Sequence, residues 1–227
     1  MRKAFTVVAA LALVVGSAYF FLFNRVVSEP AAPPEVEAPS DDVAIPPIAV
    51  GARYEVVSGE SSGRYLIREE LARISLPVDA IGVTTALTGQ VGFDSSGAVA
   101  EGSRIVVDLT SLASDESRRD QYVRSNILHT SRYPNAVFAP KEVRGIPHPV
   151  PTEGTVDVVI VGELTIRDVT REVVWEGSAT FSPDGFVISA ATTITFEEFG
   201  LSKPRVAVVL SVDDQIRLEE NIKFRSV

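Results

Sequence analysis

A strongly alternating stretch from Thr155 to Phe181 is the clearest structural signal in the chain. From Val156 to Ile166 the even positions are apolar apart from Gly162, whereas the odd positions mix valines with Asp157 and other polar residues. After a short polar connection the alternation resumes, with one face formed by Val173, Trp175, Ala179 and Phe181. Period-two patterning predicts strands with one apolar face, and two such runs joined by a few residues predict a long antiparallel hairpin.

Similar alternation continues through most of the chain beyond residue 50. It predicts strands near 53–57, 64–71, 81–93, 103–109 and 137–143, and two more after the central hairpin, in which Phe186 to Phe196 and Val212 to Phe224 carry apolar rows. In the last of these, the apolar face holds Val212, Ile216, Leu218, Ile222 and Phe224. About eight antiparallel strands in one domain favour a closed barrel, because closure leaves no exposed edge.

One segment breaks the strand pattern. Ser114 to Ser117 contains an expected N-cap and an acidic first turn, and a helix is expected from Arg118 to Leu128, ended by Tyr133-Pro134. The prediction is therefore an all-β, eight-stranded antiparallel barrel with one helical excursion. An eight-stranded barrel is either filled by side chains or holds one small ligand.

The inward-facing positions of this barrel are the candidate ligand-binding residues. They are apolar or aromatic and would line the lumen: Tyr65, Ile67, Leu87, Val91, Phe93, Val107, Leu109, Leu128, Phe138, Val158, Ile160, Leu164, Val173, Trp175, Ile188, Phe196, Ile216 and Leu218. Each is also an ordinary core residue, so a packed interior remains the alternative for any one of them. Glu69 shares a face with Tyr65 and Ile67 and, with Arg119, is a candidate polar group at the rim.

The N-terminal region has a different composition. Ala4 to Phe23 are 20 uncharged, mostly apolar residues behind Arg2 and Lys3, long enough for one bilayer core. Residues 1–25 are therefore expected to form an uncleaved signal anchor with a cytoplasmic N-terminus, a cleaved signal peptide being the alternative. Residues 26–50 are rich in proline and acidic residues and predict a disordered linker. Residues 51–227 would form the barrel domain outside the cytoplasm.

Composition narrows the possible functions. The net charge is −9 and no basic stripe occurs, which argues against nucleic-acid binding. The chain has no cysteine, and its two histidines, His129 and His148, do not form a zinc-ligand pattern, so no metal site is predicted and both are expected at the surface. No nucleophile elbow or phosphate-binding glycine loop occurs. We expect Arg118-Arg119-Asp120 to hold the helix against the barrel through ion pairs; an arginine meeting a ligand head group is the alternative.

A series of short motifs follows in order along the chain: Leu109-Thr110-Ser111-Leu112, Ser114-Asp115, Arg119-Asp120, Tyr133-Pro134-Asn135-Ala136-Val137-Phe138, Gly162-Glu163-Leu164-Thr165-Ile166 with Val169-Thr170, and Phe199-Gly200-Leu201. From about Arg64 to Phe224 the chain thereby resembles the YceI-like family. The resemblance implies a lipocalin-like barrel with an apolar lumen that carries a long polyisoprenoid or another amphiphilic lipid in the periplasm. It implies neither an enzymatic activity nor a cofactor.

Two positions depart from the family pattern. Many members have His in place of Glu69 and Gly in place of Asp168, and the first difference would alter the polar anchor of the pocket. Three functions remain open: a tethered lipid-binding protein, a structural or protein-interaction module with a filled barrel, and an enzyme in which Glu69, Asp120 and His129 converge. The lipid-binding function is favoured, because each buried methylene of a ligand contributes roughly 0.8 kcal/mol.

Overall fold

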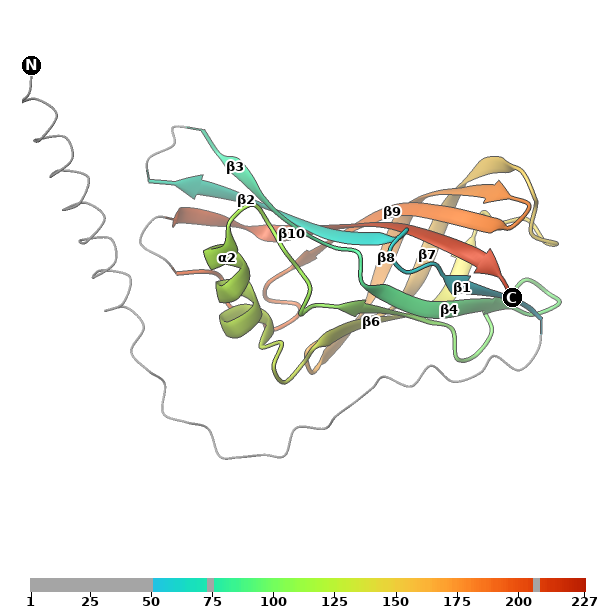
Figure 1. Cartoon of the computed structure of the whole chain (residues 1–227), viewed down its shortest axis with the longest axis horizontal. Helices are drawn as coiled ribbons and strands as arrows, with labels where there is room; N and C mark the ends of the chain where they lie inside the picture. The colour runs from blue at the N-terminus through green and yellow to red at the C-terminus, as the bar shows by residue number, and fades with distance from the viewer. Residues whose placement is uncertain (1–50, 73–75, 206–208) are drawn as a thin grey trace, which may run out of the picture. The chain divides into compact units, whose positions relative to one another are not determined.

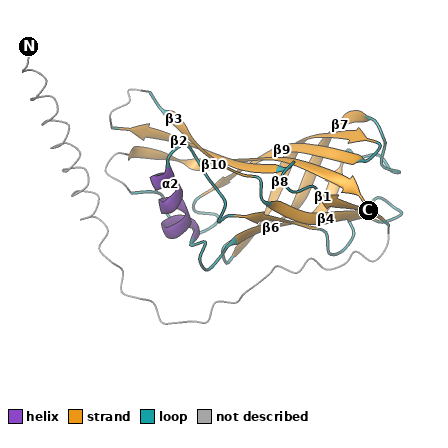
Figure 2. Cartoon of the chain, in the orientation of Figure 1, coloured by secondary structure: helices purple, strands orange, loops and turns teal. Residues whose placement is uncertain are grey.

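The computed structural model describes residues 51–72, 76–205 and 209–227, and Figure 1 follows the chain through them. Its strands are β1 (Ala52–Val56), β2 (Ser62–Leu71), β3 (Val78–Thr84), β4 (Leu87–Phe93), β5 (Arg104–Asp108), β6 (Asn135–Arg144), β7 (Gly154–Ile166), β8 (Val169–Ser182), β9 (Gly185–Thr195) and β10 (Val209–Ser226). Two short helical elements, α2 (Ser117–Tyr122) and the π-helical η1 (Val123–Leu128), lie between β5 and β6 (Figure 2). The anchor and linker predicted for residues 1–25 and 26–50 lie outside the described residues. No helix in the described part is long and apolar enough to cross a membrane.

The strands form one antiparallel sheet that closes on itself. Its order is β1-β4-β5-β6-β7-β8-β9-β10, and β10 pairs back with β1, where Tyr54 lies opposite Ser226. β10 has 18 residues and also pairs with β2, which carries β3 at its outer side. β1 and β2 thus pair with different parts of the same edge of β10 and together occupy one strand position in the barrel. β4 pairs with β1 and β3 pairs with β2, so β3 and β4 together occupy the next position. Ten segments therefore fill eight positions, which confirms the predicted eight-stranded antiparallel barrel.

The central hairpin is formed as predicted. β7 and β8 pair along their whole length, from Gly154 opposite Phe181 to Ile166 opposite Val169. The two-residue turn is Arg167-Asp168, in which Arg167 has a left-handed φ of 58°. Along β7, Val158, Leu164 and Ile166 are buried, so the even positions face inward as the alternation indicated.

The predicted single strand over 81–93 is wrong, because the chain breaks at Thr85-Ala86 into β3 and β4. The Thr84 hydroxyl accepts a hydrogen bond from the Ala86 amide at 3.1 Å, a local side-chain bond that competes with strand pairing. The break also changes which positions face inward. In β4 the odd positions such as Leu87 are buried, whereas in β3 the odd positions Ile81 and Val83 are each 38% exposed.

The helical excursion is present and ends at Leu128 as predicted, but it begins one residue earlier and its second half is π-helical. The N-cap is Glu116, within the predicted range Ser114 to Ser117, and its carboxylate accepts a hydrogen bond from the Arg118 amide. The helical path ends at His129, whose left-handed φ of 51° stops it four residues before Tyr133. The excursion lies against the end of the barrel from which β2, β3 and β10 project in Figure 1.

Candidate functional site

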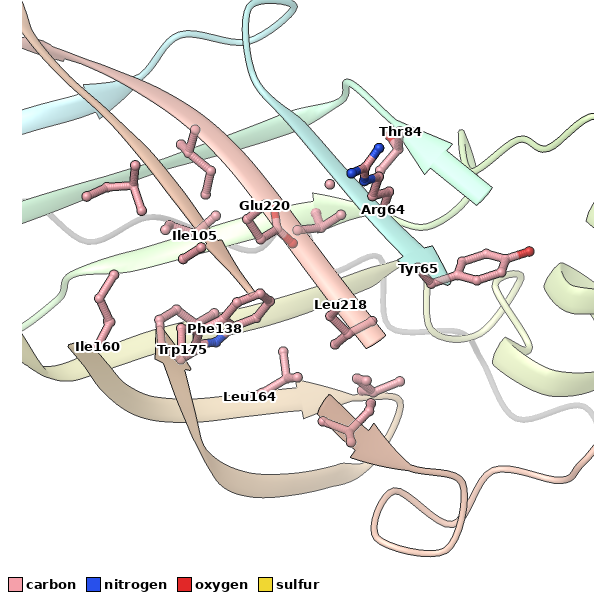
Figure 3. A pocket seen from close by; sticks show the side chains of 18 of the residues that line it. Arg64, Tyr65, Thr84, Ile105, Phe138, Ile160, Leu164, Trp175, Leu218 and Glu220 are labelled. Carbon is pink, nitrogen blue, oxygen red and sulfur yellow. The ribbon is translucent and has the colours of Figure 1, made fainter. Parts of the chain in front are cut away.

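The interior of the barrel contains a cavity of about 180 Å³, counted as the space that the centre of a water molecule can occupy. Every strand from β2 to β10, as well as η1, contributes residues to its wall. Most of the lining side chains are aliphatic or aromatic, and Figure 3 shows part of this wall. The barrel is therefore not filled by its own side chains.

One end of the cavity is closed by aromatic rings from five strands. The ring of Phe186 on β9 lies 4.8 Å from that of Tyr54 and 5.0 Å from that of Phe224, measured between centroids. Phe93 and Phe181 pack edge-on against this group. Such arrangements of rings exclude water and are favourable beyond simple burial. This cluster forms an apolar floor.

The other end is covered by the helical excursion. Val123, Ile127 and Leu128 of η1 turn their side chains to the cavity wall. The segment is held in place by the Arg167 guanidinium at the β7–β8 turn, which donates to the Ile127 carbonyl at 3.2 Å. Arg124 likewise donates to the Leu112 carbonyl at 2.8 Å. We call this covering segment, α2 with η1, the lid. This end of the cavity is therefore covered by a helical segment, whereas the wall of the barrel is a hydrogen-bonded sheet.

All of the predicted lumen residues line the cavity except Leu87, Val158 and Val173. Those three are buried in the surrounding hydrophobic core and do not reach the cavity wall. Leu87 and Val158 are among the most completely enclosed side chains in the described part of the chain. Alternation indicates which side of a strand faces inward, but not how far each side chain extends toward the axis.

The two predicted rim residues meet at the helical end. Glu69 on β2 is buried, and its Oε1 lies 3.1 Å from Nη2 of Arg119 in α2. Arg119 also bonds Asp115 at 2.6 Å. The neighbouring Asp120 accepts hydrogen bonds from the amide and the hydroxyl of Ser114, at 2.9 and 2.6 Å. The expected ion pair between the helix and the barrel thus exists and involves Arg119.

Tyr65 connects this charged group to the cavity. Its ring lies across Gly82, its partner on β3, where an added Cβ would come within 2.2 Å of the ring. Burial raises the pKa of Tyr65 to about 12, against a smaller opposing effect of the Arg119 charge. The phenol therefore stays neutral across the physiological range and extends from the apolar wall toward the Glu69–Arg119 pair.

Several residues that line the cavity are missing from the predicted set, and among them Glu220 alters the chemistry of the lumen most. It lies in the inward row of β10 between Leu218 and Ile222 and lines the cavity (Figure 3). Its Oε2 is buried and has no hydrogen-bond partner. Burial alone raises its pKa to about 8. The alternation along β10 puts residue 220 on the inward face. We did not predict it to face the lumen, because its carboxylate interrupts an otherwise apolar row.

The groups required by the enzyme hypothesis have different surroundings. Glu69 and Asp120 are engaged with Arg119 and Ser114, and His129 is exposed. His148 is exposed too, and its ring packs against Phe93 at 5.1 Å. Across the described residues, no group of three or more His, Cys, Asp or Glu side chains could hold a metal ion.

Comparison with known proteins identifies the family. The sequence matches the YceI-like domain over residues 65–224, which is more than half of the chain. The chain belongs to the YceI-like domain family. A curated relative, Protein YceI of Escherichia coli O17:K52:H18 (strain UMN026 / ExPEC), is 30% identical over 89 residues. That alignment covers 39% of this YceI-like chain and 42% of the relative, so it spans less than half of either protein.

Two solved structures resemble this YceI-like barrel. A polyisoprenoid binding domain from Saccharophagus degradans, implicated in plant cell wall breakdown, aligns with a TM-score of 0.60 and 12% identity. It covers 77% of this chain and 98% of that one. BcnA from Burkholderia cenocepacia aligns with a TM-score of 0.55 and 15% identity, covering 74% and 98%. At these identities the likeness shows a shared fold.

Proposed function

We propose that this YceI-like domain binds a lipid with a long apolar tail, of the polyisoprenoid type, in the lumen of its barrel, and that it does so without catalysing a reaction. The observation that carries the proposal is the apolar cavity between the aromatic floor and η1. It counts against a barrel filled by its own side chains. The polyisoprenoid binding domain from Saccharophagus degradans, which shares the fold, supports the same class of ligand.

Burial of the tail provides enough free energy without any chemistry. Each methylene transferred from water into an apolar lumen contributes roughly 0.8 kcal/mol. A chain of ten carbons would thus gain about 8 kcal/mol before the costs of immobilisation, which is the range of useful affinity. An apolar wall with a few polar groups is the usual composition of such a site.

We further propose that the domain is held outside the cytoplasm by the apolar N-terminal segment. This part of the proposal rests on the sequence, in which Arg2 and Lys3 precede the apolar run from Ala4 to Phe23. A tethered carrier would take its ligand from, or deliver it to, the adjacent bilayer. The acidic, proline-rich linker would hold the barrel away from the membrane surface.

Trp175 offers a direct test of binding, because it is the chain's only tryptophan and it lines the cavity. Bromine quenches indole fluorescence at close range, so bromohexadecane is expected to quench Trp175 and unbrominated hexadecane to compete with it. The matched control moves the indole outward by one residue, with Trp175→Phe and Val174→Trp, since Val174 is exposed on the outer face. Quenching that is equal in the control would show surface adsorption and would contradict binding in the lumen.

Native mass spectrometry of the domain purified from its own host addresses the natural ligand. The proposal predicts an added mass that organic extraction releases and that matches an apolar-tailed lipid. The Ala136→Leu variant, whose added side chain enters the cavity, is expected to carry less of it. Protein that is wholly free of lipid, together with an absence of quenching by bromohexadecane, would overturn the proposal.

A further inference from the structure

The carboxyl of Glu220 occupies a defined depth in the lumen. Along β10 it lies four residues from Ile216, toward η1, and four residues from Phe224, in the aromatic floor. At about 3.4 Å per residue it is therefore about 14 Å along the strand from either position. Its place is the middle of the cavity, far from the rim where Glu69 and Arg119 meet.

The barrel wall leaves room for this carboxyl. Glu220 pairs with Gly63 on β2 and with Ala190 on β9, so the positions on both sides are small. A Cβ added at Gly63 would lie 2.9 Å from Oε2 and 3.0 Å from Oε1 of Glu220. The carboxyl thus lies over the glycine, and neither flanking residue has a side chain that could donate a hydrogen bond to it.

Two other polar residues of the wall, Arg64 and Thr84, are engaged elsewhere. Arg64, the second charged residue at the cavity, forms its ion pair with Glu219 on the opposite face of the sheet. Thr84 shares a hydrogen bond with Ser111 at 2.6 Å. Tyr65, two residues from Gly63 along β2, is neutral at physiological pH. Oε2 of Glu220 therefore remains buried without a partner in the described structure.

A second unpaired group faces the same cavity. The indole nitrogen Nε1 of Trp175 on β8 is buried without a hydrogen-bond partner. Figure 3 shows Trp175 and Glu220 directed into one pocket from different strands. An indole N–H can only donate a hydrogen bond, and a protonated carboxyl donates one as well. Burial holds Glu220 in that protonated form near neutral pH.

Leaving such groups unpaired in an apolar interior costs free energy that a leucine at either position would avoid. Unpaired buried polar groups are uncommon in native proteins and gather at functional sites. A ligand that satisfies these two hydrogen-bond donors must offer acceptor oxygens. A ligand with an ammonium group could not accept the Trp175 N–H, and the ammonium would lose its own hydration on entering the cavity.

On the basis of the proposed function, we propose that Glu220 and Trp175 form a hydrogen-bonding subsite that selects an apolar chain carrying an acceptor oxygen, such as a carbonyl or ether, part-way along its length.

Three probes of one length test this subsite: heptadecane, dioctyl ketone and dioctylamine. Each is measured by competition with bromohexadecane for the quenching of Trp175 in the whole domain. The wild-type domain is expected to bind dioctyl ketone about tenfold more tightly than heptadecane, as for one net hydrogen bond. Glu220→Leu is expected to weaken that preference severalfold, to what the Trp175 N–H alone supports, while still binding heptadecane, and Glu220→Gln, which keeps a donor, to retain most of it.

The matched control is Glu219→Leu, which removes the neighbouring carboxylate on the outer face and should leave the preference for the ketone unchanged. Raising the pH well above 8 should weaken the preference in the wild-type domain but not in Glu220→Gln. An equal preference for the ketone in Glu220→Leu, or tightest binding of dioctylamine, would overturn the subsite while lipid binding stands. If heptadecane itself failed to compete in the wild-type domain, the proposed function would fail, and the subsite with it.

Discussion

The buried carboxylate of Glu69 on β2 and the guanidinium of Arg119 in α2 form an ion pair, with Oε1 3.1 Å from Nη2. The pair connects a barrel strand to the segment that covers one end of the cavity. Removing Arg119 would leave Glu69 buried without its charged partner, which is more costly than losing an exposed pair. We expect Arg119→Met to lower the free energy of unfolding by about 2 kcal/mol, measured by urea denaturation.

The exposed pair between Arg144 and Glu142 on β6 provides the matched comparison. Exposed pairs contribute little, so Arg144→Met should be almost neutral. The double variant Arg119→Met with Glu69→Leu should recover part of the lost stability, because no unpaired carboxylate remains. Equal effects of Arg119→Met and Arg144→Met would show that the Glu69–Arg119 pair does not hold the lid.

A cavity-filling substitution distinguishes an open lumen from a packed one. Ala136 on β6 lines the cavity, so Ala136→Leu would place its added carbons in empty space. We expect unchanged or slightly higher stability and at least tenfold weaker binding of bromohexadecane. Ala179 on β8 is the control, because it is fully enclosed by the core and does not line the cavity. Overpacking there should cost about 1–3 kcal/mol. A similar loss for Ala136→Leu would be the mark of a filled barrel.

The N-terminal segment leads to a prediction that fractionation can check. The full chain is expected in the membrane fraction after washing with high salt or alkali, since an apolar span is held by burial and not by charge. A chain that starts at residue 26 should be released when it is made in the same compartment. Recovery of the full-length gene product as a soluble protein that begins after residue 23 would indicate cleavage and contradict the anchor.

Alternation was sufficient to predict the barrel because most strands carry an uninterrupted apolar row. β7 and β8 form a hairpin over the residues that the pattern indicated. The prediction failed where local bonding overrides the pattern, as at Thr85-Ala86. There the Thr84 hydroxyl accepts a hydrogen bond from the Ala86 amide, and the Ala86 carbonyl accepts one from the Asp108 amide. One predicted strand therefore becomes two, with even positions facing inward in β3 and odd positions in β4. Hydrogen bonds of this kind depend on contacts that periodicity does not encode.

The candidate site was predictable as an apolar surface but not in its polar detail. The inward rows placed Leu164 and Ile216 correctly at the cavity wall. Val158 has the same parity but is enclosed by core and does not line the cavity, and alternation alone does not distinguish it from Leu164. Glu220 has inward parity too, yet charge made it look like a surface residue. Gly63 opposite it was the signal available, because a small cross-strand partner leaves space for a carboxyl.

Glu220 also makes the stability of the empty domain depend on pH. Burial raises its folded-state pKa from 4.5 to about 8. Below pH 4.5 the Glu220 carboxyl is protonated in both the folded and the unfolded state. Between pH 4.5 and about 8 it is ionised only in the unfolded chain. The free energy of unfolding therefore falls as the pH rises through this range. The loss should amount to roughly 2–5 kcal/mol and level off above pH 8.

Urea denaturation of the lipid-free domain at a series of pH values measures this loss. Other carboxyls act in the opposite direction at low pH; the pKa of Glu219, for example, is lowered by its hydrogen bond from Arg217. Subtracting the profile of Glu220→Gln removes these contributions, since that variant keeps them all. The difference should grow between pH 4.5 and 8 in favour of the variant. A flat difference would mean that the Glu220 carboxyl is hydrated in the empty barrel, and that water, not a ligand oxygen, satisfies it.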